Sequence, residues 1–479
     1  MNAPLDLAAE RPGANKRMKT EAEGEAKVEV IGALEYSNGD LGREAYDRWK
    51  TIVPYVYDFF TNHHGQYASL SCRWGKVLSD EKYKARQRIY LSEQYGEQYE
   101  IGCNTLLVGT ADVVKARVST GDSLSKFAEN GKSPFVKISK RIFLAEEVNK
   151  IRELPAHPHI VATATDSPST YVWNTDRQPD RAKDKEYGRP SVADLILVGH
   201  ESNAEFSLAT STGGASFCSG DKDGIVLLWS LDDDETKLNG LVAEKLQGRQ
   251  SVASGSLAGV ESPELKPRMR FEGHTAVVND VCFHPSTSHE IVSVSDDRTI
   301  RFWDSRKGPG HCEVAKEAHG ADITCVDWSA SEENLVVTGC GGGIVKVFDR
   351  RKLEGAVVEL RHHSKSINCV QWCPDRAGVL ASSSEDGLLN VWDITKTSAR
   401  TPDVPPQLMI QHSGHWGEVC DFHWNPHDPW TVISTSNDAQ TEHLGAGCVQ
   451  VWRPSDLIYR PEDEVLKELE EQREKLVTH

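Results

Sequence analysis

The chain has 479 residues and is acidic, with 54 Lys and Arg against 72 Asp and Glu and a formal net charge of −18. This charge should repel nucleic acid and favour basic protein partners, although acidity also serves solubility alone. No apolar run is long enough for a membrane span, and the N-terminus lacks the apolar core of a secretory signal. The eleven cysteines form no CxxC pair and no even framework. We therefore expect a protein of a reducing, intracellular compartment.

The N-terminal segment 1–38 is polar, acidic, poor in aromatic residues and without periodicity, which predicts a disordered tail. It carries one basic cluster, NKRMK at 15–19. Such a cluster is typical of a nuclear localisation signal, but it also arises by chance. It favours a nuclear location for the protein.

An amphipathic helix is predicted over 41–60. Apolar side chains recur there at spacings of three and four, at Tyr46, Trp49, Val53, Val56 and Phe60. Pro54 removes one helical hydrogen bond, so we expect a kink or a break. A second apolar set lies off this stripe, at Ile52, Tyr55 and Phe59. A helix with two apolar faces can dock on its own protein and still offer a surface to a partner.

Five segments begin on a His-containing pair and close about thirty residues later on Trp or Phe. They are GH 199–200 to WS 229–230, GH 273–274 to WD 303–304, AH 318–319 to FD 348–349, HH 362–363 to WD 392–393, and GH 414–415 to WR 452–453. Repetition of this kind predicts a WD-repeat propeller with one four-stranded blade per repeat. Two degraded units, within 69–118 and 140–175, bring the total to seven. The expected fold is an all-β, seven-bladed propeller over 65–456.

Each good repeat of such a propeller joins a His, a turn Asp and the Trp by hydrogen bonds. The resemblance assigns these roles to His274, Asp297 and Trp303, to His200, Asp223 and Trp229, and to His363, Asp386 and Trp392. The repeat at 318–349 has Gly342 where the Asp should stand, so its network should be incomplete. These histidines are therefore interpreted as structural, not as metal ligands or catalytic groups.

Two insertions and a C-terminal helix complete the expected organisation. Residues 235–268 are rich in Ser, Gly, Lys and Glu and predict a flexible loop, and 397–407 form a Pro-rich loop before the last blade. The segment 457–479 predicts a helix, because acidic residues follow a Pro and leucines recur at Leu466, Leu469 and Leu476.

Several segments outside the repeats resemble the histone-binding WD-repeat family, also called retinoblastoma-binding or multicopy-suppressor-of-IRA-like. They include YDRWKTIVPYVYDFF at 46–60, SLSCRWG at 69–75, EVNKIREL at 147–154 and DLIYRPEDEVLKELE at 456–470. The resemblance covers about 41–476, and the closing segment looks most like the plant branch linked to flowering-time control. It implies terminal helices packed at the side of the propeller and no cofactor.

The family holds a histone H4 helix in a groove between its N-terminal helix and the loop before the last blade. Carried over by position, the groove residues are Tyr55, Val56, Phe59, Asp403, Pro405, Pro406 and Ile458. Tyr55 and Phe59 have an alternative interpretation, in which they only pack against the propeller. The loop here offers one acidic residue, Asp403, and adds Arg400, so the grip on a basic helix should be weaker than in the family.

The resemblance also implies a histone H3 tail site on the top face. Its positions here are Glu147, Asn149, Glu205, Phe206 and Asp280. Other positions depart from the family, namely Ser366, Asn368, Asn437 and the pair Tyr67-Ala68. A third site follows from WDSR at 303–306 and FDRR at 348–351, which resemble motifs that dock on the cullin-4 ligase adaptor through Arg306 and Arg351. An Arg at such a turn is alternatively a solvated surface residue.

The resulting hypothesis is a non-catalytic scaffold that binds histones H3 and H4 in chromatin complexes of the deacetylase, Polycomb repressive or chromatin assembly type and acts in transcriptional repression. The alternative is a substrate receptor of a cullin-4 E3 ubiquitin ligase. An enzyme is disfavoured because the sequence has no Gly-rich phosphate loop, zinc-spaced Cys/His set or nucleophile elbow.

Overall fold

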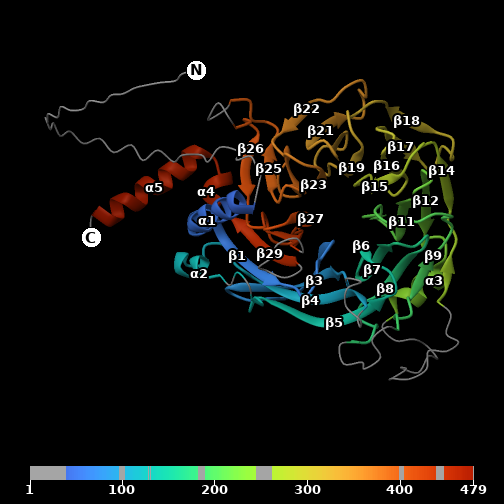
Figure 1. The fold of residues 1–479 in the computed structure, drawn as a ribbon, viewed down its shortest axis with the longest axis horizontal. Helices are drawn as coiled ribbons and strands as arrows, with labels where there is room; N and C mark the ends of the chain where they lie inside the picture. Colours follow the sequence, from blue (N-terminus) through green and yellow to red (C-terminus); the bar gives the residue numbers. More distant parts are fainter. Residues whose placement is uncertain are drawn as a thin grey trace, which may run out of the picture. The chain divides into compact units, whose positions relative to one another are not determined.

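A computed structural model describes residues 39–95, 103–127, 129, 131–181, 189–243, 262–398, 404–438 and 447–477. Within these ranges the chain folds as a seven-bladed propeller, in which seven sheets follow one another around a central opening (Figure 1). The fold class predicted from the repeats is confirmed. No helix in the described ranges has the length and apolar character needed to cross a membrane.

The strands of the blades are as follows. Blade 1 holds β2 (Cys72–Asp80), β3 (Lys84–Glu93), β4 (Asn104–Val114) and β5 (Val136–Leu144); blade 2 holds β6 (Val148–Leu154), β7 (His157–Thr165), β8 (Thr170–Asn174) and β9 (Leu195–Leu197); blade 3 holds β10 (Ala209–Thr210), β11 (Ser216–Gly220), β12 (Ile225–Ser230) and β14 (Met269–Glu272); blade 4 holds β15 (Val278–Phe283), β16 (Glu290–Ser295), β17 (Ile300–Asp304) and β18 (Cys312–Ala315). Blade 5 holds β19 (Ile323–Trp328), β20 (Leu335–Cys340), β21 (Ile344–Asp349) and β22 (Val358–Arg361); blade 6 holds β23 (Ile367–Trp372), β24 (Val379–Ser384), β25 (Leu389–Asp393) and β26 (Leu408–His412); blade 7 holds β27 (Glu418–Trp424), β28 (Val432–Asn437), β29 (Gly447–Pro454) and the N-terminal β1 (Tyr57–His64).

The ring is closed by strand β1, which pairs antiparallel with β29 as the outer strand of blade 7. The predicted boundaries are wrong here, because helix α1 (Gly39–Val56) ends before residue 60 and the propeller begins at 57, not 65. Pro54 lies in the last turn of α1, so the predicted kink or break takes the form of an ending two residues later. The run that follows, YDFFTNHH, is rich in aromatic residues, which favour strands.

The predicted inward face of α1 is confirmed by burial. Tyr46, Trp49 and Val53 are buried in a cluster that also contains core residues of blades 6 and 7. Helix α1 is therefore held against the side of the ring by its apolar stripe, as expected of an amphipathic surface helix.

The insertion at 235–268 is partly ordered, which corrects the prediction of a flexible loop. It contains helix α3 (Glu235–Val242), which buries Leu241 and is capped by the Asp234 side chain, and strand β13 (Glu264–Leu265), which adds to blade 2 parallel to β9. Asn174 Nδ2 donates to the Leu241 carbonyl at 2.8 Å. Residues 244–261 lie outside the described ranges. A short helix, α2 (Gly121–Ser125), lies in the loop after β4.

The C-terminal segment forms two helices instead of the single one predicted over 457–479. Helix α4 (Asp456–Tyr459) is followed, after Pro461, by α5 (Glu462–Val477). Helix α4 packs at the side of the ring, where Ile458 and Tyr459 rest on the cluster that buries α1. Helix α5 buries only Val465 among its described side chains, so the predicted packing does not extend along it.

The hydrogen-bonded set of the repeats is confirmed in blades 4 and 6, with one member that the sequence did not indicate. In blade 4, His274 Nδ1 lies 2.8 Å from Asp297 Oδ2, and Nε2 lies 2.8 Å from Ser293 Oγ. Trp303 Nε1 donates to the same Ser293 oxygen at 2.8 Å. Blade 6 repeats this arrangement. A serine hydroxyl therefore connects the His to the Trp.

Blades 3 and 5 differ from this pattern. In blade 3 the partner of His200 is Asp221, at 2.8 Å, and not the predicted Asp223. Asp221 also accepts from the backbone of residues 223 and 225, so it organises the turn from its first position. In blade 5, His319 bonds Thr338 through Nε2 at 2.8 Å, but its Nδ1 has no partner among the described residues. The predicted incomplete network at Gly342 is confirmed.

Candidate functional site

Helix α1 is fixed to the ring by a chain of buried hydrogen bonds. Trp49 Nε1 donates to the Tyr57 hydroxyl at 3.0 Å, which lies 2.6 Å from His412 Nδ1, and His412 Nε2 lies 2.8 Å from Gln450 Oε1. Gln450 Nε2 donates to the Gly414 carbonyl at 2.7 Å, which identifies Oε1 as its acceptor. His412 must then donate through Nε2 and accept the Tyr57 proton at Nδ1. All donors along the chain point from Trp49 towards Gly414.

The direction of this chain requires a neutral His412 ring. Burial lowers the pKa of His412 to about 3, so the ring stays uncharged at neutral pH. The ring is stacked on Trp452, with centroids 4.4 Å apart and planes 8° apart. Gly414 leaves the space for Trp49, because a Cβ at this position would lie 2.8 Å from the Trp49 ring. The C-terminal half of α1 is therefore held in one position.

The predicted groove residues Val56 and Ile458 are brought together by this anchoring. The Val56 carbonyl accepts from the Ser455 N–H at 2.7 Å, and the Ile458 N–H donates to the Ser455 carbonyl at 3.0 Å. Both side chains are partly buried on the cluster that holds α1. Tyr55 is 79% exposed beside them, so it packs on nothing in the described part of the chain.

Helix α4 has its own anchor, at Tyr459. The Tyr459 ring stacks on Trp430 with centroids 4.3 Å apart, and Arg376 Nη1 donates to the Tyr459 carbonyl at 2.5 Å. Figure 1 shows α1 and α4 next to each other, close to strand β26. The end of α1 and the start of the C-terminal segment thus form one rigid edge.

The loop before the last blade contributes Pro405 and Pro406, both partly exposed. The Pro405 carbonyl accepts from the Leu408 N–H at 3.0 Å, which turns the chain directly into β26. Met409 of that strand packs on the same cluster as Val56 and Ile458. The prolines therefore lie one turn from the shared floor. Asp403 and Arg400 lie outside the described residues.

Phe59 does not belong to the groove, and this prediction is wrong. The side chain is 2% exposed and lies in β1, where its ring packs edge-on against Phe135 at 5.6 Å. It belongs to the core between blades 7 and 1. A continuous helix would have placed Phe59 one turn beyond Tyr55, on the same face. Since the strand begins at Tyr57, the side chain turns inward instead.

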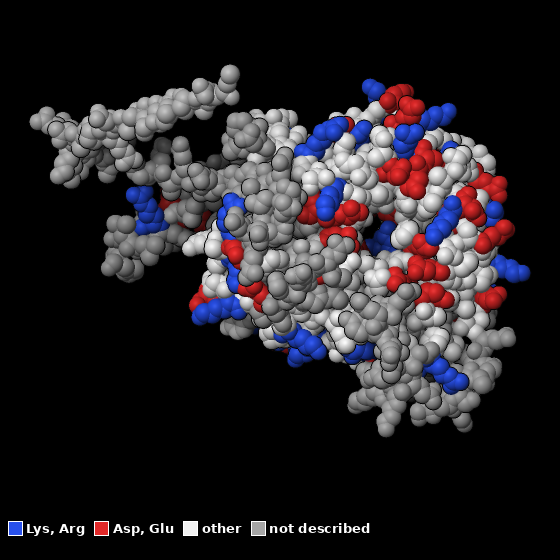
Figure 2. All heavy atoms as spheres, viewed as in Figure 1, with Lys and Arg blue, Asp and Glu red and all other residues white. Residues whose placement is uncertain are grey.

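Four of the predicted tail contacts lie at the edge where each outer strand passes to the inner strand of the next blade. Glu147 accepts from Gln94 Nε2 at 2.5 Å, and Asn149 Nδ2 donates to Asp166 at 2.7 Å. Glu205 pairs with Lys222 at 2.6 Å, and its neighbour Phe206 is 48% exposed. Figure 2 shows Asp and Glu side chains beside the opening at the centre of the ring.

Asp280 is the fifth predicted tail contact, and the structure contradicts it. The residue is buried, with Lys150 Nζ 2.7 Å from Oδ1 and the Val326 N–H donating to Oδ2 at 3.1 Å. It joins the inner strands of blades 2, 4 and 5. Arg73 and Asp421 form a similar buried pair at 3.0 Å between blades 1 and 7. Sequence reasoning missed these pairs, because their members come from distant strands.

Arg306 and Arg351 occupy equivalent turns at the ends of β17 and β21. Each guanidinium folds back on the Asp that closes its own strand, Arg306 on Asp304 at 2.9 Å and Arg351 on Asp349 at 2.6 Å. These hydrogen bonds lower the pKa of both carboxyls to about 2. The Arg side chains are 57% and 70% exposed, so a partner can reach them.

Comparison with known proteins identifies the family. The model of the WD domain, G-beta repeat, matches residues 265–304, 310–349 and 356–393, and the model for the histone-binding protein RBBP4 and the corresponding component of the CAF1 complex matches 44–112. The WD-40 repeat-containing protein MSI4 of Arabidopsis thaliana is 44% identical over 453 residues, which cover 91% of this chain and 86% of that protein. The chain belongs to the histone-binding WD-repeat family. The predicted resemblance is confirmed.

The family match at 44–112 covers the parts of this histone-binding WD-repeat protein that a generic propeller lacks. It spans most of α1, the closing strand β1 and three strands of blade 1. Members of this family are in general not enzymes. Among the described residues, no group of three or more His, Cys, Asp or Glu side chains is placed to hold a metal ion.

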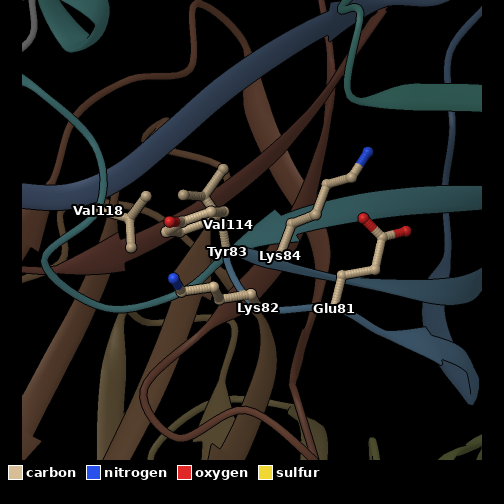
Figure 3. A pocket seen from close by; sticks show the side chains of 6 residues that line it. All are labelled: Glu81, Lys82, Tyr83, Lys84, Val114 and Val118. Carbon is tan, nitrogen blue, oxygen red and sulfur yellow. The ribbon is translucent and has the colours of Figure 1, made fainter.

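One pocket lies apart from all predicted site residues. It has a volume of about 360 Å³ and is lined by Glu81, Lys82, Tyr83, Lys84, Val114 and Val118, at the opposite edge of blade 1 from Glu147. Figure 3 shows the valine side chains on the Tyr83 side and the Glu81 carboxylate pointing away from them. None of the groove, tail or docking residues contributes to it.

Proposed function

We propose that the protein is a non-catalytic histone-binding scaffold that holds the first helix of histone H4 between α1, the Pro405–Pro406 turn and α4. The proposal rests on one observation above all: the segment that matches the histone-binding family model carries α1, and the Val56–Ser455 hydrogen bond joins α1 to α4 over a common apolar floor. An amphipathic helix binds by placing its apolar face in such a trough.

Calorimetry with an H4 first-helix peptide tests this proposal. Tyr55→Ala and Ile458→Glu should each weaken binding about tenfold or more, because central apolar contacts carry most of the affinity of a helix in a groove. Tyr55 is exposed, so its replacement should leave the unfolding temperature unchanged. Phe206→Ala, at a distant edge of the ring, is the control and should bind normally. Undetectable binding by the unaltered protein would refute the proposal, as would normal binding by both groove variants.

A histone H3 tail is proposed for the edge that carries Glu147, Asn149, Glu205 and Phe206. Acidic side chains beside an exposed aromatic ring suit a basic, extended peptide. Glu205→Lys with Phe206→Ala should weaken binding of an H3 N-terminal peptide while leaving the H4 helix peptide unaffected. Equal affinity of this double variant and the unaltered protein for the H3 peptide would exclude the site.

We further propose that the scaffold acts in the nucleus, in transcriptional repression, as a member of a deacetylase, Polycomb repressive or chromatin assembly complex. The family membership and the basic cluster at 15–19 support this. Affinity purification from nuclear extract, followed by identification of stoichiometric subunits, distinguishes the three. Recovery of none of their catalytic or assembly subunits would count against the assignment.

The second candidate function is a substrate receptor of a cullin-4 ligase, supported by the exposed Arg306 and Arg351 at equivalent turns. Arg306→Ala combined with Arg351→Ala should abolish co-purification of the ligase adaptor. The matched control is Arg361→Ala, an exposed Arg that pairs with Glu359 on an outer strand. Adaptor binding that survives the double substitution would exclude this function.

A further inference from the structure

Helix α5 presents apolar side chains that the described part of the protein does not cover. Leu466 is 53% exposed and Leu469 is 44% exposed, although they stand at a spacing that places them side by side on a helix. Leu476 continues this spacing in the sequence. Exposed leucines in a row are uncommon on a surface unless they contact a partner.

The opposite side of α5 is fastened by charged groups. Arg117, from the loop after β4, donates to Glu468 at 2.9 Å through Nη1 and to Asp456 at 3.0 Å through Nε. Arg460 donates to the other Glu468 oxygen at 2.6 Å. At about 100° of rotation per residue, Leu466 lies roughly 160° around the helix from Glu468. The contacts that hold α5 therefore leave the leucine face open.

The charge of α5 restricts what can cover this face. The helix contains seven acidic and three basic residues. Asp463 and Glu470 are exposed, lie two turns apart and flank the leucines on one side. A nucleic acid backbone is repelled by this charge, and an acidic protein surface is disfavoured for the same reason. A helix with apolar residues on one face and Lys or Arg beside them satisfies both features.

The geometry points to α5 as a second docking surface, separate from the proposed H4 groove, which binds a basic amphipathic helix of another protein along Leu466 and Leu469. The partner helix places its apolar residues over the two leucines and its cations against Asp463 and Glu470. This inference does not depend on histone binding, because none of the groove side chains takes part in it.

A designed helix tests the inference by fluorescence anisotropy on the full chain. The probe is a labelled three-heptad peptide with Leu at positions a and d and Lys at e and g. Leu466→Glu combined with Leu469→Glu should weaken binding about tenfold or more, because two apolar contacts are lost. The two added negative charges would instead strengthen a purely electrostatic attraction. The two effects therefore have opposite signs.

The matched control changes the charge of α5 away from the leucines. Lys467→Glu alters the net charge by the same amount as the double substitution and lies on another face of α5, so it should retain or increase binding. A scrambled peptide of equal composition should bind weakly. Saturating H4 first-helix peptide should not displace the probe, whether or not the H4 peptide itself requires Tyr55. Absent binding, an unaffected double variant, equal binding of the scrambled peptide, or competition by the H4 peptide would each overturn the inference.

Discussion

His319 of blade 5 makes half of the side-chain hydrogen bonds that His274 makes in blade 4. Its Nδ1 is buried and has no partner in the described part of the chain, because Gly342 stands where blade 4 has Asp297. Burial lowers the pKa of His319 to about 4, with a further contribution from nearby Lys346. A buried acceptor or donor without a partner costs about 1–3 kcal/mol. Blade 5 therefore contains a repairable defect.

Gly342→Asp should repair this defect. A Cβ at Gly342 meets only ordinary contacts, at 3.7 Å from Ala321 and Cys340, so an Asp side chain fits. We expect the free energy of unfolding to rise by about 1–2 kcal/mol, since the new bond involves a charged group. The pKa of His319 should rise at the same time, because the carboxylate favours the protonated ring. Urea unfolding and a nuclear magnetic resonance titration measure the two effects.

The adjacent Gly343 provides the control for this substitution. It has a φ of +73°, and a Cβ there would lie 2.8 Å from the carbonyls of His363 and Lys365. Gly343→Asp should therefore destabilise the protein, although it introduces the same side chain one residue away. Equal effects of the two substitutions would show that the carboxylate does not act through His319.

His412 makes stability depend on pH in a direction set by its lowered pKa. The folded-state pKa of about 3 lies below the ordinary value of 6.5, so the unfolded chain takes up the proton first as the pH falls. The free energy of unfolding should therefore decrease below about pH 7, by about 2 kcal/mol at pH 5 from this ring alone. In His412→Phe, which keeps a ring over Trp452, this part of the dependence should disappear.

The measurement is guanidinium unfolding of both proteins at pH 7 and pH 5. His412→Phe should be less stable at pH 7, by about 2–4 kcal/mol, because Tyr57 and Gln450 lose their partner. The difference between the two proteins should narrow at pH 5. A difference that stays constant between the two pH values would contradict the assignment of a neutral, buried His412.

At the scale of elements, α5 depends on Arg117 for its position. Arg117 comes from the loop after β4 and bonds Asp456 at the start of α4 and Glu468 in the middle of α5. Arg117→Ala should speed backbone hydrogen exchange in 462–477 and leave exchange in β4 unchanged. High salt should have a similar effect on the unaltered protein, because exposed ion pairs are screened. Exchange in α5 that does not respond to either change would mean that Val465 alone holds the helix.

The sequence predicted elements best where one period governed a long segment. The stripe of Tyr46, Trp49 and Val53 marked the inward face of α1 correctly, because helical spacing continues through all three. The same spacing misplaced Phe59, since the change from helix to strand occurs within a run that is apolar in either conformation. A proline near that boundary was the available signal, but it fitted a kink as well as an end.

Side chains with long-range partners were the least predictable. Asp280 has suitable chemistry for a basic tail, yet it is committed to Lys150, which lies 130 residues away in the sequence. Asp221 and Asp223 both fit a turn acceptor for His200, and only the path of the backbone decides between them. Ser293 stands in a strand like any polar residue, and its position between His274 and Trp303 follows from the strand register. Such contacts depend on tertiary geometry that local pattern does not contain.

At the scale of the whole molecule, stability depends on the strand that closes the ring. Strand β1 pairs with β29, and Arg453 of β29 bonds Asp58 of β1 at 2.9 Å and Asp428 at 2.6 Å. Without β1, blade 7 keeps three strands and exposes an unpaired edge. The seven blades then no longer form a closed ring.

Deletion of residues 1–64 should therefore cause unfolding or aggregation, whereas deletion of residues 1–38 should leave the unfolding temperature within about 2 °C of the intact chain. Deletion of 1–56 removes α1 but keeps β1, and we expect a folded ring of lower stability that exposes the apolar cluster under α1. Circular dichroism melts of the three proteins give the comparison. A stable, monomeric protein lacking residues 1–64 would show that β1 is dispensable.

The same strand has a consequence for biosynthesis. The two residues of the Asp58–Arg453 contact are 395 positions apart, so the first blade strand to leave the ribosome must wait for the last one. At a synthesis rate of about 5–20 residues per second, this wait is roughly 20–80 s. During that time β1 has apolar side chains but no neighbour, and it is a target for chaperones or for premature association with another nascent chain. Codon usage that slows translation should lengthen this period of vulnerability without changing the protein that finally folds.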